Sequence, residues 1–159
     1  MKKYFQNTFA LLIVTAFLAN TPTFAQFTTY NFTAFGVKFD VPNTHKIKKN
    51  QGTEFESGDN LTWLELYPFN DASVTSDAMI DIVIGEKAMK VEQRGKYTSG
   101  GYNGTWIRCT DDAHPDWKFW VIGFIDPNSE TNFYSIIWYK KNNQTAYDIA
   151  YKMSYSFKK

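Results

Sequence analysis

Two stretches of the sequence, WKFWVIGFI at residues 117–125 and TNFYSIIWY at residues 131–139, decide the fold. Both are apolar at odd and at even positions, so neighbours such as Phe119 and Trp120 point to opposite sides of an extended chain. Strands that are apolar on both faces belong in the middle of a sheet that is covered on each side. The intervening DPNSE (126–130) has the composition of a turn, which predicts that the two strands form an antiparallel pair.

Two further pairs of strands are predicted upstream of this one. Residues 53–56 and 61–67 are typical of a hairpin joined by a Ser-Gly-Asp-Asn turn. Residues 91–98 and 103–110 flank Gly100–Gly101, and glycine accepts the positive φ that a tight hairpin requires. The central part of the chain is therefore expected to be rich in antiparallel hairpins.

The segment before these hairpins is predicted to contain two more strands, at residues 27–32 and 34–41. Pro42 ends the second of them, because proline cannot donate a hydrogen bond to a neighbouring strand. Residues 45–52 are polar and rich in lysine. We predict a connection between strands there.

Two helices are predicted from capping residues and from the spacing of apolar residues. The first is expected at about 76–90, with Thr75 or Ser76 as its cap, although its β-branched run also suits a strand. Asn142 or Asn143 caps the second. Its apolar stripe consists of Ala146, Ile149, Ala150 and Met153. Hairpins with segregated helices define the α+β class, so we predict a mainly antiparallel sheet covered by helices.

Composition and charge limit the possible classes of protein. The chain has 159 residues, which favours a single domain, and 17 Lys+Arg balance 16 Asp+Glu. This balance argues against a dedicated nucleic-acid binder, so no nucleic-acid partner is expected. Cys109 is the sole cysteine of the sequence, which excludes an internal disulfide. No motif of the sequence predicts a bound cofactor.

Residues 1–25 have the three parts of a secretory signal peptide. Two lysines near the start precede an apolar run at 9–19, and residues 23–25 place small side chains before a cleavage point. The apolar run is too short for a membrane span, which needs about 20 apolar residues. We therefore expect export to the periplasm or the cell exterior, no transmembrane anchor after cleavage, and one mature domain at residues 26–159.

The layout and two short motifs resemble a known family. A Phe-x-Val-Pro strand end at 39–42 is followed by hairpins, a mid-chain helix, two long apolar strands and a last helix that runs into Ser156 and Phe157. This order resembles the PsbP-like superfamily of small exported or thylakoid-lumen proteins. The resemblance implies an α/β/α sandwich. That superfamily includes photosystem accessory proteins, nuclear-import regulators and envelope proteins, and no catalytic motif transfers from it to this chain.

One dense polar cluster is the candidate for catalytic or metal chemistry. It combines a thiol, an imidazole and three carboxylates within eight residues: Cys109, Asp111, Asp112, His114 and Asp116. Such groups could hold a divalent metal, or His114 could act as a base toward a Cys109 nucleophile. A loop that joins two strands accounts for the same composition without any ligand. We favour the loop interpretation and predict no metal site.

The aromatic residues provide a second candidate site. Trp63 and Tyr67 share one face of their predicted strand with Glu65, so that face is a candidate for partial exposure. Flat exposed rings stack on ligands or contact partner proteins. The alternative, favoured on general grounds, is that a helix covers them, since large aromatic side chains are mostly interior or half-buried.

These features predict an exported, non-enzymatic binding or accessory protein of the cell envelope. Trp63 and Tyr67 are its candidate contacts for an unknown protein or small-molecule partner. The alternative hypothesis is a metal-dependent or hydrolytic module that uses the loop formed by Asp111, Asp112, His114 and Asp116. The two hypotheses differ in which candidate residues converge in space, and spacing along the chain leaves that open.

Overall fold

The computed structural model describes residues 25–32, 35–71, 73–126 and 131–159. The predicted signal peptide, apart from its last residue, lies outside the described residues, and so does most of the predicted 126–130 turn. None of the helices in the described part of the chain is long and apolar enough to cross a bilayer.

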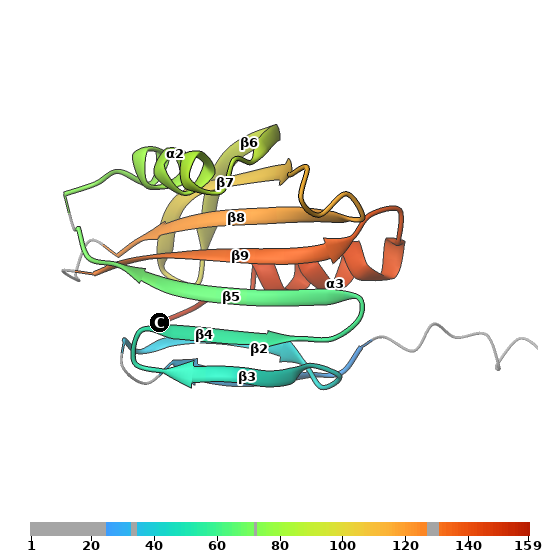
Figure 1. Cartoon of the computed structure of the whole chain (residues 1–159). Coiled ribbons are helices and arrows are strands. Elements are labelled where there is room, and N and C mark those ends of the chain that lie inside the picture. Colours follow the sequence, from blue (N-terminus) through green and yellow to red (C-terminus); the bar gives the residue numbers. More distant parts are fainter. Residues whose placement is uncertain (1–24, 33–34, 72, 127–130) are drawn as a thin grey trace, which may run out of the picture.

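A seven-stranded sheet forms the centre of the described structure, in the order β3-β4-β5-β9-β8-β7-β6 (Figure 1). Every neighbouring pair in it is antiparallel, which confirms the predicted sheet type. Its strands are β3 (Lys46–Gln51), β4 (Glu54–Gly58), β5 (Thr62–Phe69), β6 (Lys90–Ser99), β7 (Tyr102–Thr110), β8 (Trp117–Ile125) and β9 (Asn132–Lys140).

The two strands that are apolar on both faces, β8 and β9, lie side by side in the interior of this sheet. Trp120 is opposite Ile137, and Val121 is opposite Ile136. All four side chains are buried. The first pair belongs to the core on one face of the sheet and the second pair to the core on the other face. The expectation of a sheet with apolar cores on both sides is confirmed.

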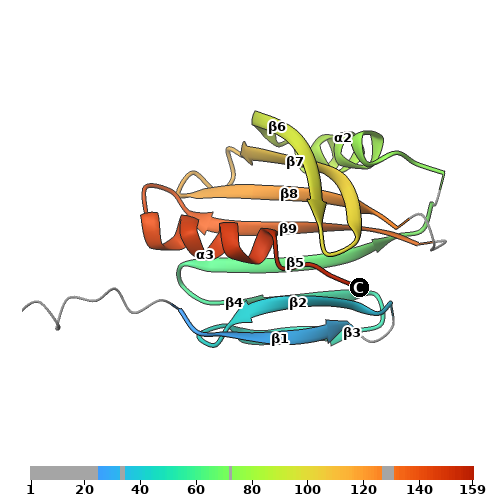
Figure 2. The same ribbon diagram turned by 180° about the vertical axis from the view of Figure 1, so that it is seen from behind.

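One face of the sheet is covered by helix α3 and by a small second sheet (Figure 2). The second sheet pairs β1 (Phe27–Phe32) with β2 (Val37–Pro42) in antiparallel register. Helix α3 (Gln144–Ser154) begins after Asn143, whose side chain accepts a hydrogen bond from the Ala146 backbone N–H. The predicted cap and apolar stripe of this helix are confirmed.

Aromatic rings fill the core beneath this cover. Phe157 lies 4.6 Å from Phe124 of β8 and 5.6 Å from Phe39 of β2, measured between ring centroids. Lys38 and Lys158 form a backbone bridge that ties the end of the chain to β2. The terminal Ser-Phe motif is therefore part of the core rather than a free tail.

Helix α2 (Ser76–Glu86) lies on the opposite face, over β7 and β8. Its buried side chains Met79, Ile80 and Val83 face the sheet. Gly123 of β8 permits this close approach, because a Cβ at that position would come within 2.9 Å of the Met79 side chain. At this point the side chains of α2 therefore pack directly against the backbone of β8.

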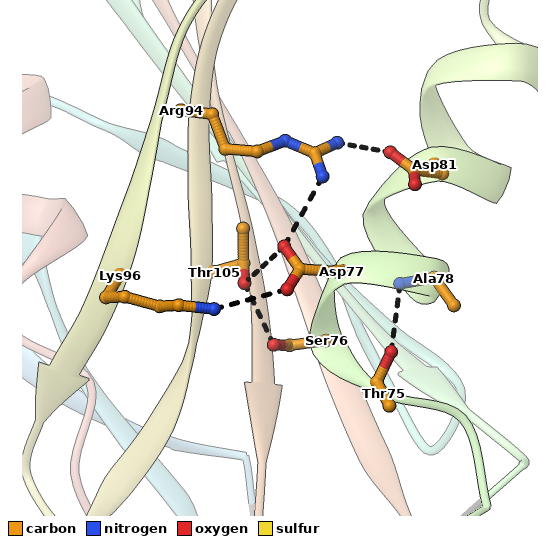
Figure 3. Close-up of polar contacts among 8 residues, drawn as sticks. All are labelled: Thr75, Ser76, Asp77, Ala78, Asp81, Arg94, Lys96 and Thr105. Carbon is orange, nitrogen blue, oxygen red and sulfur yellow. Dashed lines mark hydrogen bonds and ion pairs between the residues drawn. The ribbon is translucent and has the colours of Figure 1, made fainter.

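Polar contacts fix the start of α2 to β6 and β7 (Figure 3). The Asp77 carboxylate accepts hydrogen bonds from the Thr105 hydroxyl at 2.9 Å and from the Lys96 ammonium at 3.2 Å. Arg94 pairs with both Asp77 and Asp81. These contacts hold α2 toward the β6 edge, so the same face of β9, β5 and β4 carries no described helix (Figure 1).

One predicted helix boundary and one predicted connection are wrong, each for a physical reason. Helix α2 ends at Glu86 rather than at Lys90, because Ala88 adopts a positive φ of 49° and Lys90 begins β6 opposite Thr110. The predicted connection at 45–52 contains the edge strand β3, in which every residue is exposed. An edge strand rich in lysine shows no apolar alternation, since charge at an edge prevents unwanted pairing.

His45 connects the start of β3 to the next two strands from a buried position. Its Nδ1 lies 3.1 Å from Ser57 Oγ of β4, and its Nε2 lies 2.7 Å from Thr62 Oγ1 of β5. Burial lowers the pKa of His45 to about 4, against the opposing effect of Asp59. The folded protein therefore keeps this ring neutral at neutral pH.

We predict that His45 makes the fold less stable in mild acid. The unfolded chain protonates this residue below its ordinary pKa of 6.5, whereas the folded chain does so only near pH 4. The neutral His45 ring therefore makes its full contribution to the free energy of unfolding at pH values above the unfolded pKa of 6.5. This contribution is lost as the pH falls toward the folded pKa, by about 3 kcal/mol. Urea unfolding of the wild type and of His45→Gln at neutral and acidic pH measures this loss, which the variant removes.

The matched control is His114→Gln, a change at the exposed histidine of the chain. This variant retains His45 and is therefore expected to keep the loss of stability that His45 causes in acid. An equal loss of stability in acid for wild type and His45→Gln would contradict the prediction.

Candidate functional site

A hollow of about 380 Å³ opens on the part of the sheet that α2 leaves uncovered. Figure 1 shows this face of β5 and β9 without a helix over it. We name the hollow the tryptophan groove. Three tryptophans and three carboxylates line it: Trp63, Trp117, Trp138, Glu56, Asp59 and Glu65.

Pairing between strands brings these side chains together. Trp63 of β5 is directly opposite Trp138 of β9, and Glu65 is opposite Glu56 of β4. Residues opposite each other in an antiparallel pair stand on the same face, about 4.5–5.5 Å apart at Cβ. On its other side Trp63 is opposite Gly58, where a Cβ would lie 1.9 Å from the indole ring. The indole therefore occupies the space that a side chain at residue 58 would take.

Trp138 is the centre of a cluster of aromatic rings. Measured between ring centroids, it lies 4.7 Å from Phe119, 4.8 Å from His114 and 6.1 Å from Trp117, each in an edge-on arrangement. Such contacts contribute about 0.5–1.5 kcal/mol beyond burial, so they fix the orientation of the rings. Trp63, Trp117 and Trp138 are nevertheless only half-buried.

Tyr67 stands beside the groove rather than in its lining. Its half-buried ring stacks on Tyr134 at 5.2 Å, and its hydroxyl donates a hydrogen bond to Glu65 at 3.2 Å. Burial, followed by the Glu65 charge, raises the pKa of Tyr67 well above its ordinary value, so the hydroxyl keeps its proton for this bond. The structure thus places Trp63 in the groove and Tyr67 beside it. A ligand contact by either residue stays a prediction.

Glu65 is a buried carboxyl group in the aromatic wall of the groove. Burial raises its pKa, while the Lys87 ammonium and the Tyr67 hydroxyl act in the opposite direction. The buried Trp138 N–H also lies near this carboxyl group and favours its charged form, but without the geometry of a full hydrogen bond. The wall of the groove therefore holds an indole N–H with no fully formed hydrogen bond to the described residues.

The other two carboxylates already have partners. Glu56 lies 3.4 Å from the Lys49 ammonium, which also pairs with Glu54. Asp59 accepts hydrogen bonds from the Thr44 hydroxyl at 2.6 Å and from two backbone N–H groups at 2.8 and 2.9 Å. Burial acts to raise the pKa of Asp59, but these bonds outweigh it and hold the pKa below its ordinary value. Asp59 is therefore negatively charged at neutral pH.

The polar cluster that was the candidate for metal or catalytic chemistry is divided between separate partners. His114 Nδ1 lies 2.8 Å from the Asp111 carboxylate, which also accepts a bond from the His114 backbone N–H at 2.6 Å. Asp112 pairs instead with Lys90 at 2.6 Å, and Asp116 is exposed. Within the described ranges, no three His, Cys, Asp or Glu side chains are grouped so that they could hold a metal ion. The contacts within the cluster are those of a loop that joins β7 to β8.

Cys109 is separated from this loop. It is buried on β7, with its Sγ 3.5 Å from Met89 Sδ. Burial raises the pKa of the thiol to about 12, so Cys109 is protonated at neutral pH. The pairing of Cys109 with His114 that the sequence suggested is not formed, because His114 is bonded to Asp111 and packs against Trp138.

Trp117, Trp138, Glu56 and Asp59 are members of the site that sequence reasoning missed. The alternation within residues 131–139 does place Trp138 on one face of its strand. It leaves open which strand lies next to it. The pairing of β5 with β9 joins distant parts of the chain, and no local pattern encodes it.

Comparisons with known proteins define the fold. No protein-family model matches the sequence, and no curated protein matches it. The Ran-binding protein Mog1p of Saccharomyces cerevisiae is similar in structure, with a TM-score of 0.57 at 9% identity, over 84% of this chain and 95% of that one. The cyanobacterial PsbP protein CyanoP of Synechocystis sp. PCC 6803 is similar with a TM-score of 0.57 at 11% identity, over 87% and 95% of the two chains.

The protein therefore has the α+β fold that Mog1p and PsbP share. The predicted likeness to PsbP-like proteins is confirmed at the level of the fold. Proteins of one fold carry many unrelated functions, so the role of this chain has to be argued from the tryptophan groove.

We predict that Gly58→Ala displaces the Trp63 indole from the groove. The added methyl group would lie 1.9 Å from the ring, so the ring must move. Overpacking of this kind costs about 1–3 kcal/mol of folding free energy. Fluorine NMR of protein labelled with fluorotryptophan, with the Trp63 signal assigned from Trp63→Phe, should show that signal shifted and the unfolding midpoint lowered.

Gly52→Ala is the matched control, because a Cβ at Gly52 meets no atom within 4 Å. It is expected to leave the Trp63 signal and the unfolding midpoint unchanged. A Trp63 signal that keeps its position in Gly58→Ala would show that the indole does not lie over residue 58.

Proposed function

We propose that this protein is an exported, non-enzymatic binding or accessory protein of the cell envelope, and that the tryptophan groove receives its partner. The observation that carries the proposal is the gathering of Trp63, Trp117 and Trp138 around an open hollow on an uncovered part of the sheet. Aromatic surface exposed to water is unfavourable, and its concentration in one place marks a site for a ligand or partner. The volume also suits a ligand, since small-molecule sites measure about 300–1,000 Å³.

The state of the reactive groups supports a non-enzymatic role. The Cys109 thiol is buried and protonated, and His114 is bonded to Asp111 within its own loop. A nucleophile needs a base within reach, and this pair lacks that geometry. The metal-dependent or hydrolytic alternative gains no support from these contacts. One of the proteins of similar fold is itself named as a Ran-binding protein, which is consistent with a binding role.

Export is proposed from the charged start, apolar run and small-residue end of residues 1–25. We predict that the full chain with a C-terminal tag, made in a bacterial host, reaches the periplasm or the medium as a product that begins at Gln26. Intact-mass measurement of the fractionated protein tests this. Leu12→Arg is the control, because a charge within the apolar run should block export. A full-length chain that stays in the cytosol would contradict the proposal.

Partner contact at the groove is tested by photocrosslinking. Benzoylphenylalanine in place of Tyr67 puts a reactive aromatic group next to the groove, in cells that naturally make the protein. We predict a defined adduct, detected by mass spectrometry after irradiation. Trp63→Ala in the same chain should abolish the adduct while the protein stays folded at the temperature of irradiation, because the Trp63 ring is half-buried rather than part of the core.

The same probe in place of Tyr151 is the matched control. Tyr151 lies on α3, over the opposite face of the sheet, and is 48% exposed. Adducts should form from position 67 and not from position 151. Equal adducts from both positions, or none from position 67, would rule out the groove as the contact site.

A further inference from the structure

The rings of the tryptophan groove offer a surface that attracts positive charge. The face of an indole ring carries negative potential, and tryptophan is the aromatic residue that binds cations best. The chain already uses one of these rings in this way, because Lys140 places its ammonium 4.4 Å from the centroid of Trp117. A second cation in the groove would contact Trp63 and Trp138.

The charged groups in the lining are all negative. Glu56, Asp59 and Glu65 line the groove, and among the described residues the lining includes no basic side chain, although Lys140 lies on the ring of Trp117. Lys49 partly neutralises Glu56 at 3.4 Å, and Lys87 acts on Glu65 from the end of α2. Asp59 has no such basic partner among its described hydrogen bonds, which come from a hydroxyl and from backbone N–H groups. The lining therefore complements a cation.

The indole rings, which make up much of the lining, favour one kind of cation. Asp59 already accepts three bonds, Glu56 has an ammonium partner, and Glu65 accepts the Tyr67 hydroxyl. The indole rings offer no acceptors to replace the water around a primary ammonium, which brings three strongly hydrated N–H donors. A quaternary ammonium group brings none. Its methyl groups can pack against the indoles while its charge is balanced by the carboxylates.

We infer that the tryptophan groove binds the quaternary ammonium group of a small organic cation, an inference that rests on the proposed function. The hollow of about 380 Å³ lies at the small end of ligand sites, which suits a trimethylammonium head with a short tail. Trp63 and Trp138 contact the methyl groups, and Glu65 faces the charge. The ligand class thus follows from the combination of aromatic rings and carboxylates in the lining of the groove.

Choline is the first probe, titrated into the mature protein and followed through the indole N–H signals in NMR spectra. We expect saturable shifts of the Trp63 and Trp138 signals. The neutral isostere 3,3-dimethylbutan-1-ol, which has a carbon in place of the nitrogen, should bind at least about tenfold more weakly, because it lacks the charge. Ethanolamine, with a primary ammonium, should also bind about tenfold more weakly, because its N–H donors lose water that the indole rings do not replace.

Two variants and one control locate the site. Trp63→Leu and Glu65→Gln should each weaken choline binding about tenfold, through loss of the ring face and of the charge. Trp106→Leu is the matched control, since Trp106 is a half-buried tryptophan that packs against Trp120 on the opposite face of the sheet. It should leave choline binding unchanged. The comparison of choline with its isostere uses the unaltered chain, so it holds even where a variant folds poorly.

The outcomes separate this inference from the proposed function. Equal affinity for choline and its neutral isostere, or for choline and ethanolamine, would overturn the inference. So would choline binding that Trp63→Leu leaves unchanged. Absence of choline binding together with adducts from position 67 would overturn the ligand class and leave the proposed function standing. Absence of both would overturn both.

Discussion

The structure depends on the need to cover a sheet whose central strands are apolar on both faces. Trp120 and Ile137 are buried on one side of β8 and β9, and Val121 and Ile136 on the other. A helix is about 10 Å across and strands lie about 4.8 Å apart, so one helix covers about two strands. A sheet of seven strands therefore needs more cover on each face than one helix provides.

The two faces meet this need differently. On one face, α3, the β1-β2 sheet and the ring of Phe157 together close the core. On the other, α2 is the one described helix, and Asp77 binds it to Thr105 and Lys96 on the β7 and β6 side. The strands farther from that edge remain open, and they carry tryptophans where an exposed sheet face normally carries polar residues. The groove is the consequence of that incomplete cover.

Local rules are broken at the groove, and buried polar groups without a hydrogen-bond partner in the described part of the chain also occur at Trp120 and Ser135. Glu65 is a carboxyl group buried among rings, and the Trp138 N–H is buried without a fully formed hydrogen bond among the described residues. By contrast, His45 is buried between the hydroxyls of Ser57 and Thr62. Natural proteins break such rules mainly at functional sites, where a ligand supplies the missing interaction. The groove combines such groups with an open hollow, so we assign binding to the groove and structure to His45.

Local periodicity determined the α+β class, the antiparallel hairpins, the two-faced strands and the shared face of Trp63 and Tyr67, because side-chain direction alternates along any extended chain. The same logic failed at β3, where an exposed edge strand leaves no apolar pattern to read. Tertiary structure alone decided that Trp63 faces Trp138, that Gly58 makes room for the indole, and that α2 stops short of both. These features arise from pairing between distant strands and from the limited width of a helix, which no stretch of sequence expresses by itself.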